Sequence, residues 1–302
     1  MYKKSGLSVI FLAKKLMALK QNERIATISE FAEEACLARG TIQNGLQFLK
    51  DQHAIVLEPR GHLGTFISQI NYQLLWSLTE IGTLTGAMPL PYSKLYEGLA
   101  TGIYAAAERF GLDMNIAYVS GARTRINLLI RGSYDYVITS ALAAKTAKEE
   151  GLPIKVCLHF GKGSYLSEHV ILFAHEGKSA IEDGMRVGVD QSSLDMQYLT
   201  TQICLGKDVQ LINIPYNQIV KQIQQKSIDA GIWNYDEIKE KSLPINFAHL
   251  PINKIFLESS DAVVLIHDNQ SGLFNLLQTI LHKKTILECQ SKVINAMLMP
   301  TY

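Results

Sequence analysis

Strand-like and helical segments alternate along most of this 302-residue chain, and the alternation limits the possible folds more than any other feature. Thr83–Met88 is strand-like, and residues 93–110 then carry apolar side chains four residues apart, the spacing of one helical face. The same alternation continues through residues 115–160 and again through 185–241. Strands separated by helical segments indicate parallel, doubly wound sheets, so we expect an α/β fold.

Two stretches indicate that this α/β part has two lobes joined by two crossings. Ser167–Ala174 reads as a strand that enters a second lobe, and strand Ala262–His267 as the return to the first. This layout resembles the type 2 periplasmic-binding-protein folds, which bury a small ligand between their lobes. We expect a first lobe of about 82–166 plus 255–302 and a second of about 170–250.

Residues 27–66 have the pattern of a helix-turn-helix followed by a two-stranded wing. Thr27 can cap a first helix, Ile28–Cys36, and a second helix would turn its apolar residues at 42, 46 and 49 inward. Ala54–Glu58 and Gly64–Ser68 then read as two strands joined by a turn-rich, cationic tip. We therefore expect an N-terminal winged helix-turn-helix DNA-binding domain at 1–70 and a two-lobed effector domain at 71–302.

The exposed side chains of the winged helix are of the types that contact phosphates and base edges. Residues 1–70 hold nine Lys or Arg against six Asp or Glu, a balance of +3, so the remainder of the +1 chain carries 1 − 3 = −2. The basic share lies with the expected DNA-binding domain. The candidate DNA-binding residues are Thr27, Arg39, Thr41, Gln43, Asn44, Arg60 and His62.

The winged-helix segment resembles the GntR-type winged helix of bacterial transcription regulators. The matching residues are Thr27, Glu30-Phe31-Ala32, Arg39, Thr41-Ile42, Leu46, Leu49 and Gly64-Thr65-Phe66. Ser29 and Gln43 stand where that family usually has arginine, and the wing tip is one residue longer. A winged helix used only for protein contacts is the alternative.

The remaining chain resembles the effector domain of the YhfZ-like regulators, which have a type 2 periplasmic-binding-protein-like fold. The residues that carry this resemblance are Met88–Ser93 with Glu97–Ala100, Asp135–Ser140, Gly188–Ser193 and Asp229–Asn234. The two resemblances together imply a ligand-responsive transcription regulator.

Ligands of open α/β sheets bind beyond the carboxyl ends of the strands, where the next helix presents free N–H groups and a partial positive charge. Several expected strand ends are polar, and Arg123 opens a helix there. Hydroxyl groups, helix N-termini and this arginine favour a small anionic metabolite with a carboxylate or phosphate. The candidate ligand-binding residues are Tyr92, Ser93, Ser120, Arg123, Ser140, Gln191, Ser192, Ser193, Trp233 and Asn234.

Each of these residues also has a purely structural interpretation. The serines are suited to be ordinary helix N-caps, which any α/β protein needs at such positions. Arg123 and Arg125 could be solvated charges on a surface helix, with Arg123 the better ligand candidate because it opens the helix. Tyr92 and Trp233 could be core aromatics.

No motif for catalysis, metal binding or a cofactor is evident. The eight histidines are dispersed, and the four cysteines form neither a C-x-x-C pair nor a metal-ligand cluster. We therefore expect no catalytic residues, metal or cofactor. A small-molecule enzyme with a vestigial DNA-binding head is one alternative function, and a solute-binding protein is another.

The N-terminus imitates a secretory signal, because Lys3 and Lys4 precede an apolar run, but Lys14 and Lys15 interrupt it without a cleavage site. No run approaches the ~18 apolar residues of a membrane span. We therefore expect a cytoplasmic protein without membrane contact.

A dimer is expected because one winged helix reads only a few base pairs, whereas a homodimer adds two half-sites of double-stranded operator DNA. The apolar segment 71–80 is the candidate interface, through Leu74, Leu75, Trp76 and Leu78. The alternative is that this segment packs the head against its own sensor.

Overall fold

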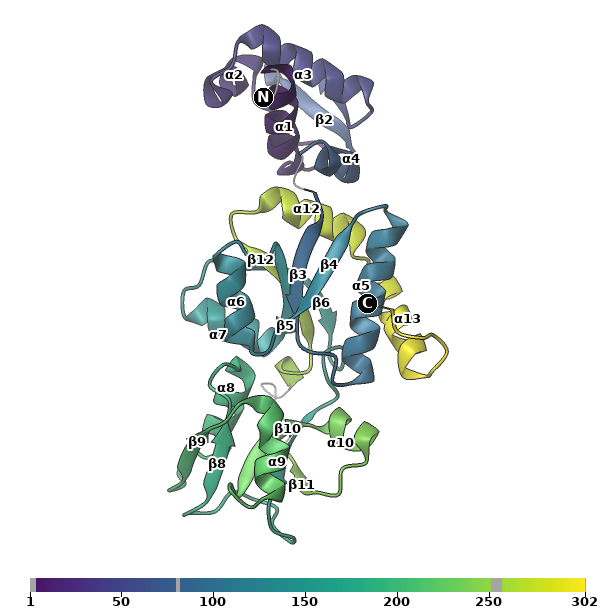
Figure 1. Ribbon diagram of the computed structural model, residues 1–302. Helices are drawn as coiled ribbons and strands as arrows, with labels where there is room; N and C mark the ends of the chain where they lie inside the picture. The colour runs from purple at the N-terminus through teal and green to yellow at the C-terminus, as the bar shows by residue number, and fades with distance from the viewer. Residues whose placement is uncertain (1–3, 80–81, 251–256, 302) are drawn as a thin grey trace. The chain divides into compact units, whose positions relative to one another are not determined.

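The computed structural model describes residues 4–79, 82–250 and 257–301 (Figure 1). Three parts of the expectations lie outside the described residues: residues 1–3 of the head, Glu80 in the apolar segment, and residues 255–256 of the first lobe. Contacts divide the chain into two compact units. The first comprises 1–84, 106–114 and 268–282, and the second comprises 85–105, 115–267 and 283–302.

Three helices begin the first unit: α1 (Lys4–Met17), α2 (Ile28–Ala35) and α3 (Arg39–Asp51). Helix α2 starts where the sequence predicts, because Thr27 Oγ1 accepts from the Glu30 N–H at 3.2 Å and the Glu30 carboxylate accepts from the Thr27 N–H at 2.6 Å. This reciprocal cap satisfies two otherwise unpaired donors. Gly45 brings α3 close to α1, since a Cβ there would lie 2.7 Å from Ser8 Oγ.

The expected wing is present as an antiparallel pair, β1 (Ile55–Pro59) and β2 (Thr65–Ile70), joined through the 3-10 turn η1 (Gly61–Leu63). The chain before α2 extends this pair, because the Ile25 N–H donates to the Thr65 carbonyl at 2.9 Å. The winged helix-turn-helix predicted from the sequence is therefore complete in the structure.

Two further helices, α4 (Tyr72–Ser77) and α12 (Ser271–Ile280), pack against α1 within the first unit. Leu75 and Trp76 of the apolar segment are buried there, whereas Leu74 and Leu78 are half-buried. Asn275 Nδ2 of α12 donates to the Met17 carbonyl at the end of α1, at 2.8 Å. The first unit thus holds, beside residues 1–70, three segments from the part of the chain expected to form the effector domain.

The first lobe of the second unit is built on a five-stranded sheet of order β4-β3-β5-β12-β6. In Figure 1, α6 and α7 lie along one side of this sheet, and α5 and α13 along the other. The strands are β3 (Leu84–Met88), β4 (Met114–Tyr118), β5 (Tyr136–Ser140), β6 (Ile154–Gly161) and β12 (Ala262–His267). The helices are α5 (Lys94–Arg109), α6 (Ala122–Ile130), α7 (Ala141–Glu149) and α13 (Lys283–Ile294).

The second lobe has another five-stranded sheet, of order β11-β7-β10-β8-β9. Its strands are β7 (His169–Phe173), β8 (Arg186–Val189), β9 (Gln210–Asn213), β10 (Ala230–Asn234) and β11 (Asn246–His249). Its helices are α8 (Leu194–Ile203), the turn η2 (Tyr216–Gln218), α9 (Ile219–Gln224) and α10 (Tyr235–Lys241). The second sheet buries one group of apolar side chains, and the first sheet another, which also includes Leu194 of α8.

The two-lobed α/β architecture is as predicted, but the sheets are mixed rather than wholly parallel. Strand β12 runs antiparallel to β5 and β6, and β7 runs antiparallel to β10 and β11. Strands β12 and β7 are those with which the chain enters one lobe from the other. Such a strand follows no crossover helix of its own lobe, so its direction is not tied to that of its neighbours. Among the described residues, no helix is long and apolar enough to cross a membrane.

Candidate functional site

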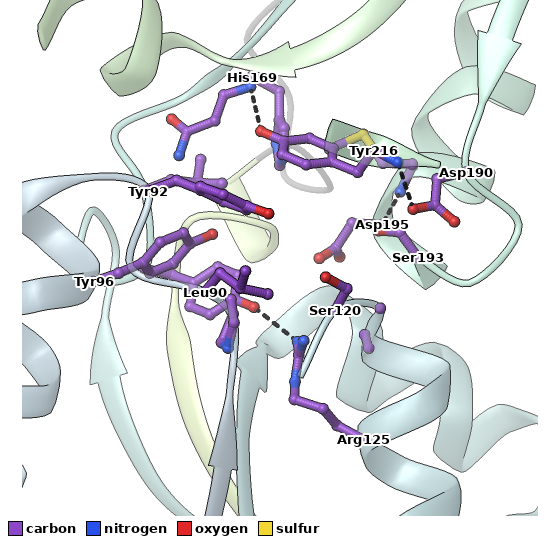
Figure 2. A pocket seen from close by; sticks show the side chains of 17 residues that line it. Leu90, Tyr92, Tyr96, Ser120, Arg125, His169, Asp190, Ser193, Asp195 and Tyr216 are labelled. Atoms are coloured by element: carbon purple, nitrogen blue, oxygen red, sulfur yellow. Dashed lines mark hydrogen bonds between the residues drawn. The ribbon is translucent and has the colours of Figure 1, made fainter. Parts of the chain in front are cut away.

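A cleft, partly open to solvent, lies between the two lobes of the second unit. Leu90, Ser120, Asp190 and Asn234 follow or end four strands, so the cleft lies beyond strand carboxyl ends as expected for such sheets. Figure 2 shows Tyr92, Ser120 and Asp195 directing oxygen atoms toward a common open space.

Arg125 of α6 supplies a buried positive charge, with 2% of the residue exposed. Its guanidinium donates to the Ile138 carbonyl at 3.1 Å, the Val119 carbonyl at 2.7 Å and the Tyr165 hydroxyl at 3.1 Å. All three acceptors are neutral. The guanidinium is therefore fixed in orientation while its charge is left for another partner.

Asp195, in the first turn of α8, supplies a buried negative charge and is 5% exposed. The Ser140 hydroxyl lies 2.6 and 2.8 Å from its two carboxylate oxygens and donates to them. Burial raises the pKa of Asp195 to about 6, although the Ser140 hydrogen bond and the charge of Arg125 act in the opposite direction. At neutral pH this carboxylate is mostly ionised and poorly solvated.

Aromatic side chains form one wall of the cleft. Tyr216 stacks on Trp233 with ring centroids 3.9 Å apart and planes 4° apart. Its hydroxyl donates to Glu237 Oε1 at 2.9 Å, and burial raises the pKa of that carboxyl. His169 also lines the cleft, and burial lowers its pKa to about 3, so the imidazole is neutral at physiological pH.

Asn234 presents an unpaired donor at the end of β10. Its Oδ1 accepts from the Asp236 N–H at 2.9 Å, which caps α10. Its Nδ2 is buried and has no hydrogen-bond partner in the described part of the chain. A buried donor of this kind costs about 1–3 kcal/mol when unpaired, so an acceptor on a ligand would be favoured there.

The structure brings four of the ten sequence-predicted ligand residues, Tyr92, Ser120, Ser193 and Asn234, into the cleft lining. Two more line an adjoining depression that shares Ser120, Asp190 and Tyr216 with the cleft. These two residues are Gln191 and Ser192.

The other four sequence-predicted residues lie outside the cleft lining. Arg123 forms a partly exposed ion pair with Glu150 at 2.8 Å. Ser140 caps α7 and contacts Asp195, and Trp233 lies behind Tyr216. Ser93 is buried immediately before α5.

Sequence reasoning assigned no ligand role to Arg125, His169, Asp190, Asp195 or Tyr216, all of which line the cleft. One available signal was a charged residue among apolar helix positions. Arg125 adjoins buried Ile126 and lies four residues before buried Leu129, and Asp195 stands between buried Leu194 and Met196. A charge on a buried helix face requires a partner, and that requirement points to a site.

The candidate DNA-binding residues lie on α3 and the wing. Arg39, Gln43 and Asn44 are exposed in the first half of α3, and Thr41 is half-buried. On the wing, the Arg60 guanidinium pairs with Glu58 at 3.0 Å and lies 4.6 Å from the centre of the Phe66 ring. His62 is exposed in η1, and the Thr27 hydroxyl is engaged in capping α2.

Comparison with protein families gives two matches that cover most of the chain. The model described as the YhfZ C-terminal domain matches residues 71–302, and the one described as a helix-turn-helix domain matches residues 20–67. The chain is 32% identical over 302 residues to the uncharacterized protein YhfZ of Escherichia coli (strain K12), covering 99% of this chain and 98% of the relative.

Solved structures show the same fold. The crystal structure of YhfZ from Shigella flexneri matches with a TM-score of 0.65 and 30% identity, over 76% of this chain and 98% of that one. The periplasmic aliphatic sulphonate binding protein SsuA from Escherichia coli matches at 0.54 and 15%, over 72% and 75% of the chains. A Salmonella typhimurium periplasmic binding protein with high arginine specificity matches at 0.55 and 13%, over 70% and 98%. At these identities, the latter two indicate the fold alone.

Proposed function

Because the chain belongs to the YhfZ family, we propose that it is a ligand-responsive transcription regulator, which binds operator DNA through the winged helix and a small metabolite in the cleft. The observation that carries this proposal is the presence in one chain of a complete winged helix-turn-helix and an interlobe cleft with buried charges. Their combination in one chain favours a coupled function.

DNA recognition is proposed to use the N-terminal half of α3. This half would enter the major groove, with Gln43 and Asn44 reaching base edges and Arg39 and Thr41 reaching phosphates or bases. Arg60 and His62 of the wing would contact the backbone beside it, and the start of α2 at Thr27 would offer N–H groups to a phosphate.

Ligand recognition is proposed to use Tyr92, Ser120, Ser193 and Asn234 as polar contacts. An anionic group on the metabolite would face Arg125, the cationic side chain in the cleft lining, rather than Arg123. The other sequence-predicted residues would support the lining, either from behind it or from the adjoining depression. They are Ser93, Ser140, Gln191, Ser192 and Trp233.

The working unit is proposed to be a homodimer, with half-buried Leu74 and Leu78 as interface candidates. Ligand binding would change how two heads fit two half-sites, and a coupling of ~1–3 kcal/mol would suffice for regulation. By linkage, DNA would change the affinity for the metabolite by the same factor.

The test is binding of the purified protein to its own upstream DNA across a salt titration. A regulator binds this DNA more tightly than random DNA of equal length, and its affinity falls as salt rises. Arg39→Ala should weaken binding, whereas Lys50→Ala, an equivalent loss of charge at the other end of α3, should have a smaller effect. Equal affinity for the two DNAs would refute the proposal.

A further inference from the structure

The cleft lining holds three buried charged side chains, Arg125, Asp190 and Asp195, whose hydrogen-bond partners are all neutral. Arg125 donates to two carbonyls and a phenol, and Asp195 accepts from a serine hydroxyl. Among the ion pairs formed within 4.0 Å by the described residues, none joins Arg125 to Asp195. Arg125 and Asp195 are therefore both kept out of water without a direct ion pair between them, although the charge of Arg125 lowers the pKa of Asp195.

Such an arrangement compensates the buried charges only in part. An ionised group in a poorly solvated site loses hydration, and neutral hydrogen bonds recover only part of it. The raised pKa of Asp195 is a sign that its burial is only partly compensated by Ser140 and Arg125. A positive group beside Asp195 and a negative group beside Arg125 would remove both penalties.

From this we propose that the cleft ligand is a zwitterion, a small molecule whose ammonium group faces Asp195 and whose carboxylate faces Arg125. The inference rests on the proposed function, since it names the chemical class of the metabolite that the cleft would sense. A ligand with only a negative charge would leave Asp195 unpaired, and a simple amine would leave Arg125 unpaired.

Other groups in the cleft fit this assignment. Asp190 is better compensated than Asp195, because its oxygens accept from the Ser192 N–H, the Ser192 hydroxyl and the Tyr216 N–H, at 2.8, 2.6 and 2.8 Å, whereas Asp195 accepts from the Ser140 hydroxyl. The ring of Tyr216 lines the cleft and suits a nearby cation, whereas the ring of Tyr92 already has Lys241 Nζ 5.6 Å from its centre. The unpaired Asn234 Nδ2 offers a donor to a ligand oxygen.

The experiment uses matched sets of probes and the full-length protein. Each of the twenty amino acids is compared by calorimetric titration at pH 8 with the amine that lacks its carboxylate and the acid that lacks its ammonium group. We expect at least one amino acid to bind, and both of its analogues to bind more weakly by ~tenfold or more, because each leaves a buried charge unpaired. Failure of every amino acid to bind, or equal affinity for the acid analogue, would overturn the inference.

A variant assigns the ammonium subsite. Asp195→Asn should weaken binding of the amino acid by ~tenfold or more and reduce its affinity advantage over the acid analogue. Glu150→Gln makes the same chemical change on the surface of the first lobe, outside the cleft lining, and should leave both affinities unchanged. Unchanged amino acid binding in Asp195→Asn would contradict the proposed subsite, and circular dichroism checks that the variant is folded.

The regulatory function is tested separately by adding the best probe to the DNA-binding assay. If an amino acid binds as described but leaves operator affinity unchanged, the zwitterion inference holds and the regulatory proposal fails. If an acid without an ammonium group binds best and changes operator affinity, the regulatory proposal holds and the zwitterion inference fails.

Discussion

The titration of Asp195 predicts how the stability of the sensor depends on pH. Its pKa is about 6 in the folded protein, against the ordinary value of 3.8 for an aspartate side chain. At 1.36 kcal/mol per unit this difference corresponds to up to about 3 kcal/mol. Folding raises the pKa. The contribution of Asp195 to the stability of the folded protein is therefore fully present below pH 3.8 and is lost as pH rises through 6.

Asp195→Asn removes this titration and retains one side-chain oxygen that can accept from Ser140. The stability of the variant relative to the wild type should rise between pH 4 and pH 7. At pH 8 the variant should be more stable than the wild type by up to about 3 kcal/mol, less any cost of the new amide donor. His169 acts in the opposite direction, since burial lowers its pKa to about 3 and protonation in acid disfavours folding. It is present in both proteins, so the difference between them isolates Asp195.

The assay is urea unfolding at pH 4, 5, 6, 7 and 8, followed by tryptophan fluorescence, with Trp233 reporting on the second lobe. Glu150→Gln serves as the control, because folding shifts the pKa of Glu150 in the opposite direction to that of Asp195. The hydrogen bonds from Arg123 lower the Glu150 pKa. A stability difference between Asp195→Asn and the wild type that does not change from pH 4 to pH 8 would refute the reasoning.

Three further predictions concern the first unit. Thr27→Ala should destabilise the head by about 1 kcal/mol, because it removes the acceptor for the Glu30 N–H, and Thr27→Ser should retain most of that stability in thermal unfolding. Gly45→Ala should cost about 1–3 kcal/mol of stability, because its methyl group would lie 2.7 Å from Ser8 Oγ and 2.9 Å from Leu12. Faster hydrogen exchange in α1 is the expected sign, and unchanged exchange would contradict the contact. Leu74→Asp should shift light scattering from dimer to monomer at micromolar concentration, and a wild type that is already monomeric with and without DNA would argue against dimerisation.

The sequence predicts the elements well where the apolar period is regular. Strand β12 matches its predicted range of Ala262–His267, and β7 lies within the expected Ser167–Ala174. The directions of β7 and β12 were less accessible, because the local pattern of a strand does not say whether its neighbours run parallel to it. That information lies in how the chain passes between the lobes.

The site was predictable in position but not in charge. Strand ends led to Tyr92, Ser120, Ser193 and Asn234, because the carboxyl edge of a sheet can be located from the order of elements. The charged groups, Arg125 and Asp195, instead lie within the first turns of helices. There the inward direction depends on how each helix packs, and Arg123, two residues before Arg125, turns outward to Glu150.

The contact between α1 and α12 has a consequence for synthesis of the chain on the ribosome. Met17 and Asn275 are 258 positions apart, so the partner that donates to the end of α1 is among the last parts to be made. At about 5–20 residues per second, the N-terminal helix waits roughly 10–50 s for it. During that interval the apolar face of α1 that packs on α12 is available to chaperones or to other nascent chains. An early stop codon before α12 would leave the same face permanently uncovered, and we expect such a product to aggregate.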